Sequence, residues 1–107
     1  MTKPVLIPLS DLSAADIREL HRIIDDDYNG SAPALRAHRP IIVRENADDY
    51  SILDGYHRAA CALSEEREWI LAVIATPSEL ASYVGCEFGE QAAQVWADSV
   101  LEAHGCR

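Results

Sequence analysis

Hydrophobic and polar residues follow two different patterns over the first quarter of the chain. Residues 4–9 (PVLIPL) form a short apolar run that predicts a β-strand, and Pro8 places this strand at a sheet edge or marks its end. Residues 12–25 carry apolar side chains at the spacing of one helix face: Ile17, Leu20 and Ile24. We therefore expect a strand followed by an amphipathic helix.

The start of this helix carries capping signals. Ser13 is a favourable N-cap residue, and Asp16 stands at the third helical position. Leu12, before the cap, can pack against Ile17 inside the helix. Beyond the helix, residues 25–33 (DDDYNGSAP) break the pattern with acids, Asn-Gly and proline, which is typical of a loop.

The middle of the chain has the pattern of a β-hairpin that leads into a helix. Residues 41–46 (IIVREN) and 50–53 (YSIL) predict two strands, and the segment 45–49 between them is a loop of hairpin length. An Asp-Gly pair then precedes residues 56–63, which have helical composition.

The last third predicts one strand and two helices. Residues 69–75 (WILAVIA) are a continuous apolar run, so we expect a strand that is buried on both faces. Residues 76–79 (TPSE) are a strong helix start, because Thr caps, Pro takes the first helical position and Glu completes a capping box. That helix should end at Gly85. A final helix should run from 90 to 104, with Gly105 as its stop.

The resulting order, β-α-β-β-α-β-α-α, predicts one small α+β (α/β) domain over residues 1–107. With 49% hydrophobic and 25% charged residues, the composition is that of an ordinary soluble globular protein. The net charge of −9 repels phosphate backbones, so nucleic acid is not an expected partner. No run is long and apolar enough to predict a membrane span.

Cysteines, tryptophans and histidines carry weaker signals. The sequence has no CxxC pair among its three cysteines, Cys61, Cys86 and Cys106. Because it also shows no secretory leader, we expect reduced thiols and a cytoplasmic location. We expect Trp69 and Trp96 in the core or between the last helix and the sheet. Three histidines are expected at the surface or at helix caps: His21, His38 and His104.

The start of the 56–63 helix carries the clearest candidate chemistry. Asp54-Gly55 lies where a strand turns into a helix, and glycine permits both the backbone angles and a close approach. The first helical turn has unpaired N–H groups and the positive dipole end, which together form an anion site. His57 and Arg58 lie in that turn, and arginine is a planar donor suited to phosphate oxygens. The pattern indicates a phosphate cradle of Gly55, the amides that follow it, His57 and Arg58.

Structural interpretations of the same residues stay open. Arg58 could pair with Asp54, and His57 could cap or pack. Asp54 is the candidate functional acid beside the cradle, or it holds the turn through its side chain. Tyr56 could cover a nucleotide base if it points outward, or it could pack.

Two further groups contain residue types that occur in metal or catalytic sites. The acids at 25–27 could serve as a base or as Mg²⁺ ligands, although a solvated helix end is the simpler interpretation. His57 and Cys61 have a spacing that suits two metal ligands on one helix face, but no second pair completes a site. Cys61 among alanines is most simply a small core residue, so we predict no protein-bound metal.

Residues 39–63 (RPIIVRENADDYSILDGYHRAACAL) resemble the central segment of the ParB N-terminal/sulfiredoxin-like superfamily. The shared features are a proline before an apolar strand, a hairpin, a second strand that ends in Asp-Gly, a basic helix start and small residues. The opening IPLSDL with its helix is also similar, so the likeness covers roughly residues 5–74, and its specific part is 40–62. It implies a mixed sheet with flanking helices, and implies that Gly55, His57 and Arg58 contact nucleotide phosphates.

Departures from the family narrow what the resemblance implies. Sulfiredoxins carry the catalytic cysteine directly before the His-Arg pair, and that position is Tyr56 here, so sulfinic-acid reductase activity is not expected. Partition ParB proteins have a Gly-Glu-Arg-Arg type sequence and a downstream helix-turn-helix domain, which the sequence to Arg107 does not show. The Asp-Gly-x-His-Arg form is closer to stand-alone members such as free serine kinases.

The first functional hypothesis is a nucleotide- or phosphate-binding domain that acts as an ATP-dependent small-molecule phosphotransferase or a nucleotide hydrolase. ATP or another nucleoside triphosphate, with Mg²⁺, would be the cofactor. Asp54 would be catalytic, and Gly55, Tyr56, His57 and Arg58 would bind the nucleotide. The alternative is a non-catalytic regulatory or protein-interaction module, with a homodimer as one possible state. DNA partition or nuclease activity ranks last.

Overall fold

Four strands form one mixed sheet in the part of the chain that the computed structural model describes, which comprises residues 3–26, 39–84 and 90–105. The strands, in chain order, are β1 (Val5–Pro8), β2 (Ile41–Glu45), β3 (Tyr50–Asp54) and β4 (Trp69–Ile74). The helices are α1 (Ala14–Asp26), α2 (Tyr56–Ser64), α3 (Pro77–Val84) and α4 (Glu90–Ala103), with a short 3-10 turn, η1 (Leu9–Asp11), after β1. The predicted order of elements is therefore confirmed, and their bounds agree within two residues.

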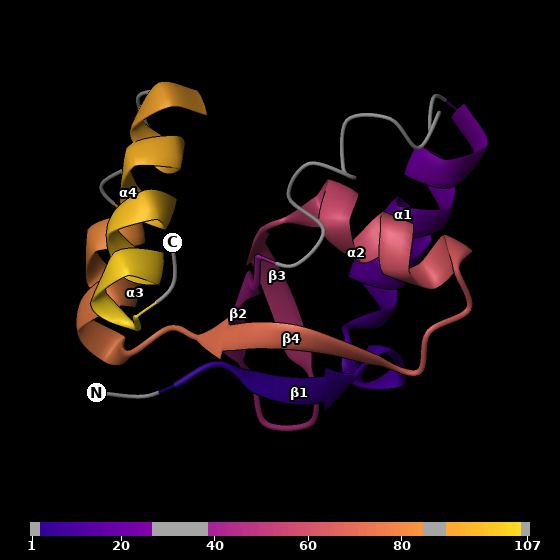
Figure 1. Ribbon diagram of the computed structural model, residues 1–107, viewed down its shortest axis with the longest axis horizontal. Helices are drawn as coiled ribbons and strands as arrows, with labels where there is room; N and C mark the ends of the chain where they lie inside the picture. The colour runs from indigo at the N-terminus through magenta and orange to yellow at the C-terminus, as the bar shows by residue number, and fades with distance from the viewer. Residues whose placement is uncertain (1–2, 27–38, 85–89, 106–107) are drawn as a thin grey trace.

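The strand order across the sheet is β1-β4-β2-β3 (Figure 1). The β1–β4 and β2–β3 pairs are antiparallel, whereas β2 and β4 are parallel, so the sheet is mixed as expected. Pro8 ends β1, which lies at the sheet edge, so both expectations for this proline are confirmed. Helices α1 and α2 cover one face, and α3 and α4 cover the other (Figure 1).

Each face of the sheet buries its own apolar cluster. On the face of α1 and α2, Leu20 and the alanines of α2 pack against Ile41, Val43 and Ile52. The small alanine side chains allow α2 to approach the sheet closely. On the other face, residues of β2, β4 and α4, together with Ala75 directly after β4, form the second cluster: Ile42, Val73, Ala75, Trp96, Ala97, Val100 and Leu101.

The expectation that β4 is buried on both faces is wrong for its first half. Ala72 and Val73 are buried, but Trp69 is 52% exposed and Leu71 is 37% exposed. The reason is coverage: the cluster under α4 reaches β4 at Val73, and β2 pairs with β4 only from Ala72 onward. The expectation of a core position is therefore confirmed for Trp96 and wrong for Trp69.

The predicted helix caps are present. Ser13 Oγ accepts a hydrogen bond from the Asp16 N–H (3.2 Å). At α3, the Thr76 N–H donates to Glu79 Oε1 (2.9 Å) and the Glu79 N–H donates to Thr76 Oγ1 (3.2 Å), which is a complete capping box. Gly105, with φ of 79°, follows the end of α4 as expected, whereas the stop predicted at Gly85 lies outside the described residues.

For His104 the surface alternative is wrong, whereas its position directly after the end of α4 matches the alternative of a helix end. Its side chain is buried, and Nε2 lies 3.0 Å from Glu79 Oε2, so the end of α4 is joined to the start of α3. His21 is exposed as expected, and His38 lies outside the described residues. Over the described ranges, none of the helices has the length and apolar content that a bilayer crossing requires.

Candidate functional site

Strand β3 passes into α2 at Gly55, whose backbone is left-handed with φ of 104°. A Cβ atom at this position would lie 2.6 Å from Ile41 Cγ2 and 2.9 Å from Arg58 Nη2. Both distances are too short for real contacts, so the turn requires glycine for its backbone angles and for its packing. The close approach to Gly55 that the sequence predicts is present, and the side chains of Ile41 and Arg58 make it.

The first turn of α2 presents the backbone N–H groups that precede the first intrahelical bond. Gly55 has no side chain to cap the helix, and the first intrahelical bond runs from the Ala59 N–H to the Gly55 carbonyl (2.9 Å). The amides of residues 56–58 precede that bond, and the first turn contains no acidic residue. His57 is exposed at this end of the helix. The first-turn amides, the positive end of the helix dipole and an exposed histidine therefore lie at the same end of α2.

Arg58 runs back from α2 to the sheet. Its Nη2 donates to Asp54 Oδ2 (2.9 Å) and to the Pro40 carbonyl (3.3 Å), and its side chain is only 11% exposed. The pairing with Asp54 that the sequence left open is therefore present. It joins the start of β2, the end of β3 and α2, and it offsets much of the positive charge at the cradle.

Tyr56 points toward α1 and not toward solvent. Its hydroxyl donates to Asp16 Oδ1 (2.9 Å) and lies 3.2 Å from the Ile52 carbonyl oxygen, while the Ile52 N–H donates to Asp16 Oδ2 (2.7 Å). Burial first, and then the hydrogen bond to Asp16, raise the pKa of the Tyr56 hydroxyl. The packing alternative for Tyr56 matches this geometry.

Sequence reasoning missed the role of Asp16. This carboxylate is buried and links three elements, α1, β3 and α2, although its position in the sequence suggested only a helix start. Its partners lie 36 and 40 residues away, so no local pattern could have identified them. An acid on the core-facing side of an amphipathic helix was the one available signal.

Beside α2 lies a cavity of about 210 Å³, which we call the basic slot. Arginines are prominent among its lining residues, and the lining also includes Trp69 and the Cys61 thiol. That thiol donates to Glu65 Oε1 (3.0 Å), so Cys61 is not the simple core residue that the sequence suggested. The full lining is Leu6, Arg39, Arg58, Cys61, Ala62, Glu65, Arg67, Trp69, Ile70 and Leu71.

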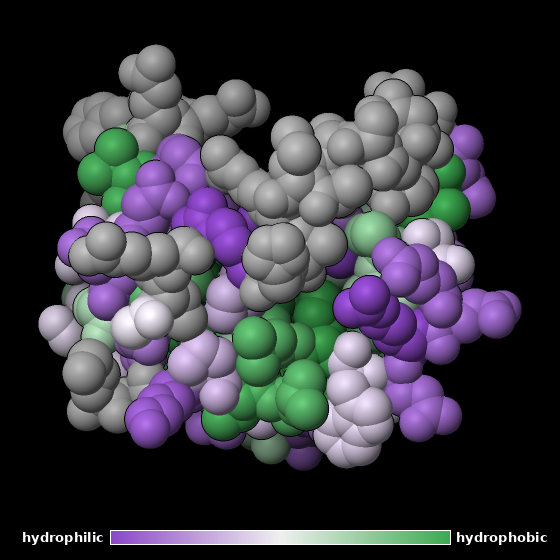
Figure 2. All heavy atoms as spheres, viewed as in Figure 1, coloured by the Kyte–Doolittle hydropathy of each residue, from purple (hydrophilic) through white to green (hydrophobic). Residues whose placement is uncertain are grey.

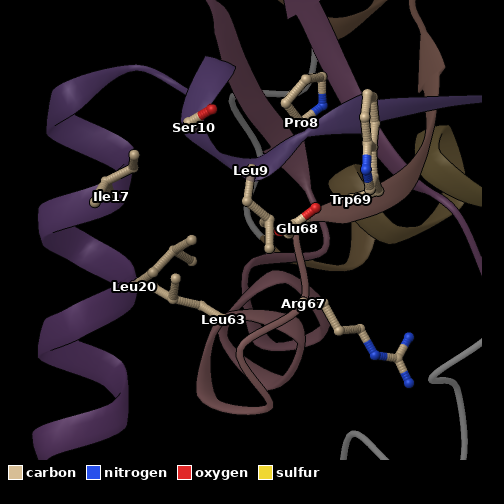
Figure 3. A pocket seen from close by; sticks show the side chains of 9 residues that line it. All are labelled: Pro8, Leu9, Ser10, Ile17, Leu20, Leu63, Arg67, Glu68 and Trp69. Atoms are coloured by element: carbon tan, nitrogen blue, oxygen red, sulfur yellow. The ribbon is translucent and has the colours of Figure 1, made fainter.

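A larger cavity of about 510 Å³ opens between α1 and the end of α2 (Figure 3). Ile17 and Leu20 of α1 and Leu63 of α2 line it, with Leu9 of η1 above them, whereas the Arg67 side chain extends away (Figure 3). The walls are mainly apolar, and no group at this cavity selects a particular ligand.

The remaining candidates do not converge on a metal site. Asp25 is exposed at the end of α1, and nothing is described of the side chains at 26 and 27. Within residues 3–26, 39–84 and 90–105, no three His, Cys, Asp or Glu side chains come together as a metal-binding group.

Comparison of the sequence with known protein families and with curated proteins gives no match, so the start of α2 and the basic slot are assessed on their own geometry.

Proposed function

We propose that the protein binds the phosphate groups of a nucleotide, or of another phosphorylated small molecule, at the start of α2. The observation that carries this proposal is Gly55, a left-handed N-cap residue that offers no side-chain cap to the amides in the first turn of α2. A phosphate at this position would accept hydrogen bonds from these amides and would lie at the positive end of the helix dipole.

Each neighbouring side chain has a distinct part in this proposal. His57 is exposed and would donate directly to the ligand. Asp54 holds Arg58 in one orientation, which reduces the side-chain entropy that binding would cost. A bound phosphate would then share the guanidinium with Asp54. Tyr56 would act as a positioning residue, because it fixes the start of α2 to Asp16.

The resemblance to the ParB/sulfiredoxin-like superfamily supports a nucleoside triphosphate such as ATP as the ligand and a ParB/sulfiredoxin-like fold for the domain. Mg²⁺ would come with the triphosphate, since Asp54 Oδ2 is already engaged by Arg58. Phosphotransfer or hydrolysis would need a general base, and Asp54 is the candidate. Its release from Arg58 would be a requirement of that chemistry.

A second candidate is the non-catalytic interaction module, and one observation favours it. Apolar side chains on one face of β1 and β4 are exposed, among them Leu6 at 63%, together with Leu71 and Trp69. Figure 2 shows hydrophobic (green) side chains gathered on the surface where Figure 1 draws these two strands. Such a patch is a common feature of protein-binding surfaces.

Thermal unfolding with nucleotides tests the phosphate proposal. The melting temperature should be measured with ATP, CTP, GTP and ADP, with and without Mg²⁺. A ligand at 100 times its Kd stabilises by about 2.7 kcal/mol, which is on the order of 10 °C for a chain of this size. His57→Ala is the informative variant because His57 is exposed, and His21→Ala on α1 is the matched control.

We expect at least one nucleotide to stabilise the wild type and His21→Ala, and to stabilise His57→Ala much less. No shift with any nucleotide at millimolar concentration would reject the phosphate site and favour the interaction module. Where a shift is found, analysis of the products separates binding from phosphotransfer or hydrolysis.

A further inference from the structure

The basic slot lies beside the first residues of β4, where the ladder to β2 has not yet begun. Residues 69–71 of β4 pair with β1 on one side, but the ladder between β2 and β4 begins only at Ala72. The chain that leads into β2 at Arg39 lines the space beside these residues, and α2 closes it. The α2 residues at the slot share one helix face: Arg58, Cys61, Ala62 and Glu65.

Positive charge is concentrated in this slot although the chain carries a net charge of −9. Of the nine lysines and arginines in the chain, three line the slot: Arg39, Arg58 and Arg67. Glu65 is the one acidic residue in the lining. Arg67 pairs with Glu65 (3.1 Å), but the partners of the other two, Asp54 and Asp98, do not line the cavity.

Arg39 retains an unused donor. Its Nη2 lies 3.1 Å from Asp98 Oδ1, yet its Nε is buried and has no hydrogen-bond acceptor among the described residues. A buried donor without an acceptor is costly, so the contacts among the described residues do not fully satisfy this guanidinium. Arginine is also the side chain best shaped to bind a carboxylate or phosphate through two parallel hydrogen bonds.

The size and the walls of the slot restrict the ligand. About 210 Å³ is less than the roughly 300–1,000 Å³ of sites for drug-sized molecules, so a whole nucleoside triphosphate is too large. The lining also contains apolar side chains, among them Ala62, Ile70 and Trp69. We propose that the basic slot binds a small organic anion, with its carboxylate or phosphate head at the arginines and its hydrocarbon part against Trp69. The site shares Arg58 with the α2 start but does not depend on nucleotide binding there.

Protection of the Cys61 thiol reports directly on this slot, because Cys61 lines it and is partly exposed. The rate of alkylation by iodoacetamide should be measured in a full-length Cys86→Ser, Cys106→Ser background. The probes are butyrate, butyl phosphate and the uncharged butyramide, each up to roughly 10 mM. Butyrate or butyl phosphate should slow the reaction in a saturable way, and butyramide should not. Which of the two anions protects at lower concentration identifies the head group.

Three variants complete the test. Arg39→Gln and Arg67→Gln should each raise the concentration needed for protection by about tenfold, because each removes a charged donor. Arg44→Gln removes the same charge from an exposed position on β2 and should have no effect. The inference is overturned if neither anion protects, if butyramide protects equally, or if Arg44→Gln weakens protection as much as Arg39→Gln. A nucleotide shift that depends on His57 can succeed or fail independently of this result.

Discussion

The buried Asp16 carboxylate accepts a hydrogen bond of 2.9 Å from the Tyr56 hydroxyl, and this contact ties the first helix to the start of the helix that carries the candidate site. The same carboxylate accepts the Ile52 N–H, so one side chain fixes α1, β3 and α2 together. The position of the first turn of α2 therefore depends on a residue 40 positions earlier in the chain.

Tyr56→Phe should destabilise the fold by about 1.5–3 kcal/mol, because it removes one donor from a buried carboxylate. Equilibrium unfolding in urea measures this, and a double-mutant cycle with Asp16→Asn isolates the pair. We expect a coupling energy of at least about 1 kcal/mol. Additive effects of the two substitutions would show that the contact does not stabilise the fold.

Gly55→Ala should destabilise the fold strongly, whereas Gly105→Ala should have a small effect. Both glycines have positive φ, so alanine at either position costs about 1–2 kcal/mol of backbone strain. Only at Gly55 would the new Cβ also collide with Ile41, which adds about 1–3 kcal/mol, since nothing lies within 4 Å of a Cβ at Gly105.

Thermal unfolding of the two glycine variants provides the comparison, with Gly105→Ala as the matched control for backbone strain. Equal losses of stability in the two variants would contradict the close approach between Gly55 and Ile41.

Glu79 should make the fold sensitive to acid. Burial tends to raise the pKa of its carboxyl, but hydrogen bonds from the Thr76 amide and from His104, with the His104 charge, outweigh burial, so the pKa lies below its usual 4.5. A lowered pKa in the folded state gives stability that is present above pH 4.5 and is lost as the pH falls through the folded value.

Glu79→Gln should therefore cost about 1 kcal/mol at pH 7, from the weakened capping box, and should flatten the fall in stability below pH 4.5. Glu19→Gln, an exposed partner of Arg22, is the control and should change stability at pH 7 very little. Urea unfolding between about pH 3 and 7, a range that brackets the usual carboxyl pKa of 4.5, tests the difference. An unchanged acid limb in Glu79→Gln would refute the role given to this carboxylate.

Element ends were predictable because their causes are local. Pro8 ends a strand, and Ser13 and the Thr76–Glu79 capping box start helices. Gly55 permits a left-handed turn whatever its tertiary contacts are. Each of these signals acts within a few residues, so the pattern of the sequence contains it.

What the sequence could not predict depends on which elements meet. Trp69 is exposed because the cluster under α4 reaches β4 only at Val73. His104 is buried against Glu79, which lies 25 residues earlier, so no local pattern could predict this contact. At the candidate site, the position of Arg58 in the first turn was predictable. Its choice of Asp54 and Pro40 as partners follows from the path of β2 and β3, which no local pattern encodes.

The most direct test of the phosphate site follows backbone amide signals by ¹H–¹⁵N NMR during titration with ATP and Mg²⁺. We expect saturable shifts centred on the amides of residues 56–58, which precede the first intrahelical bond of α2. These shifts should be strongly reduced in His57→Ala and retained in His21→Ala. Unchanged amides at residues 56–58 at saturating nucleotide, or shifts confined to other parts of the molecule, would contradict the phosphate site.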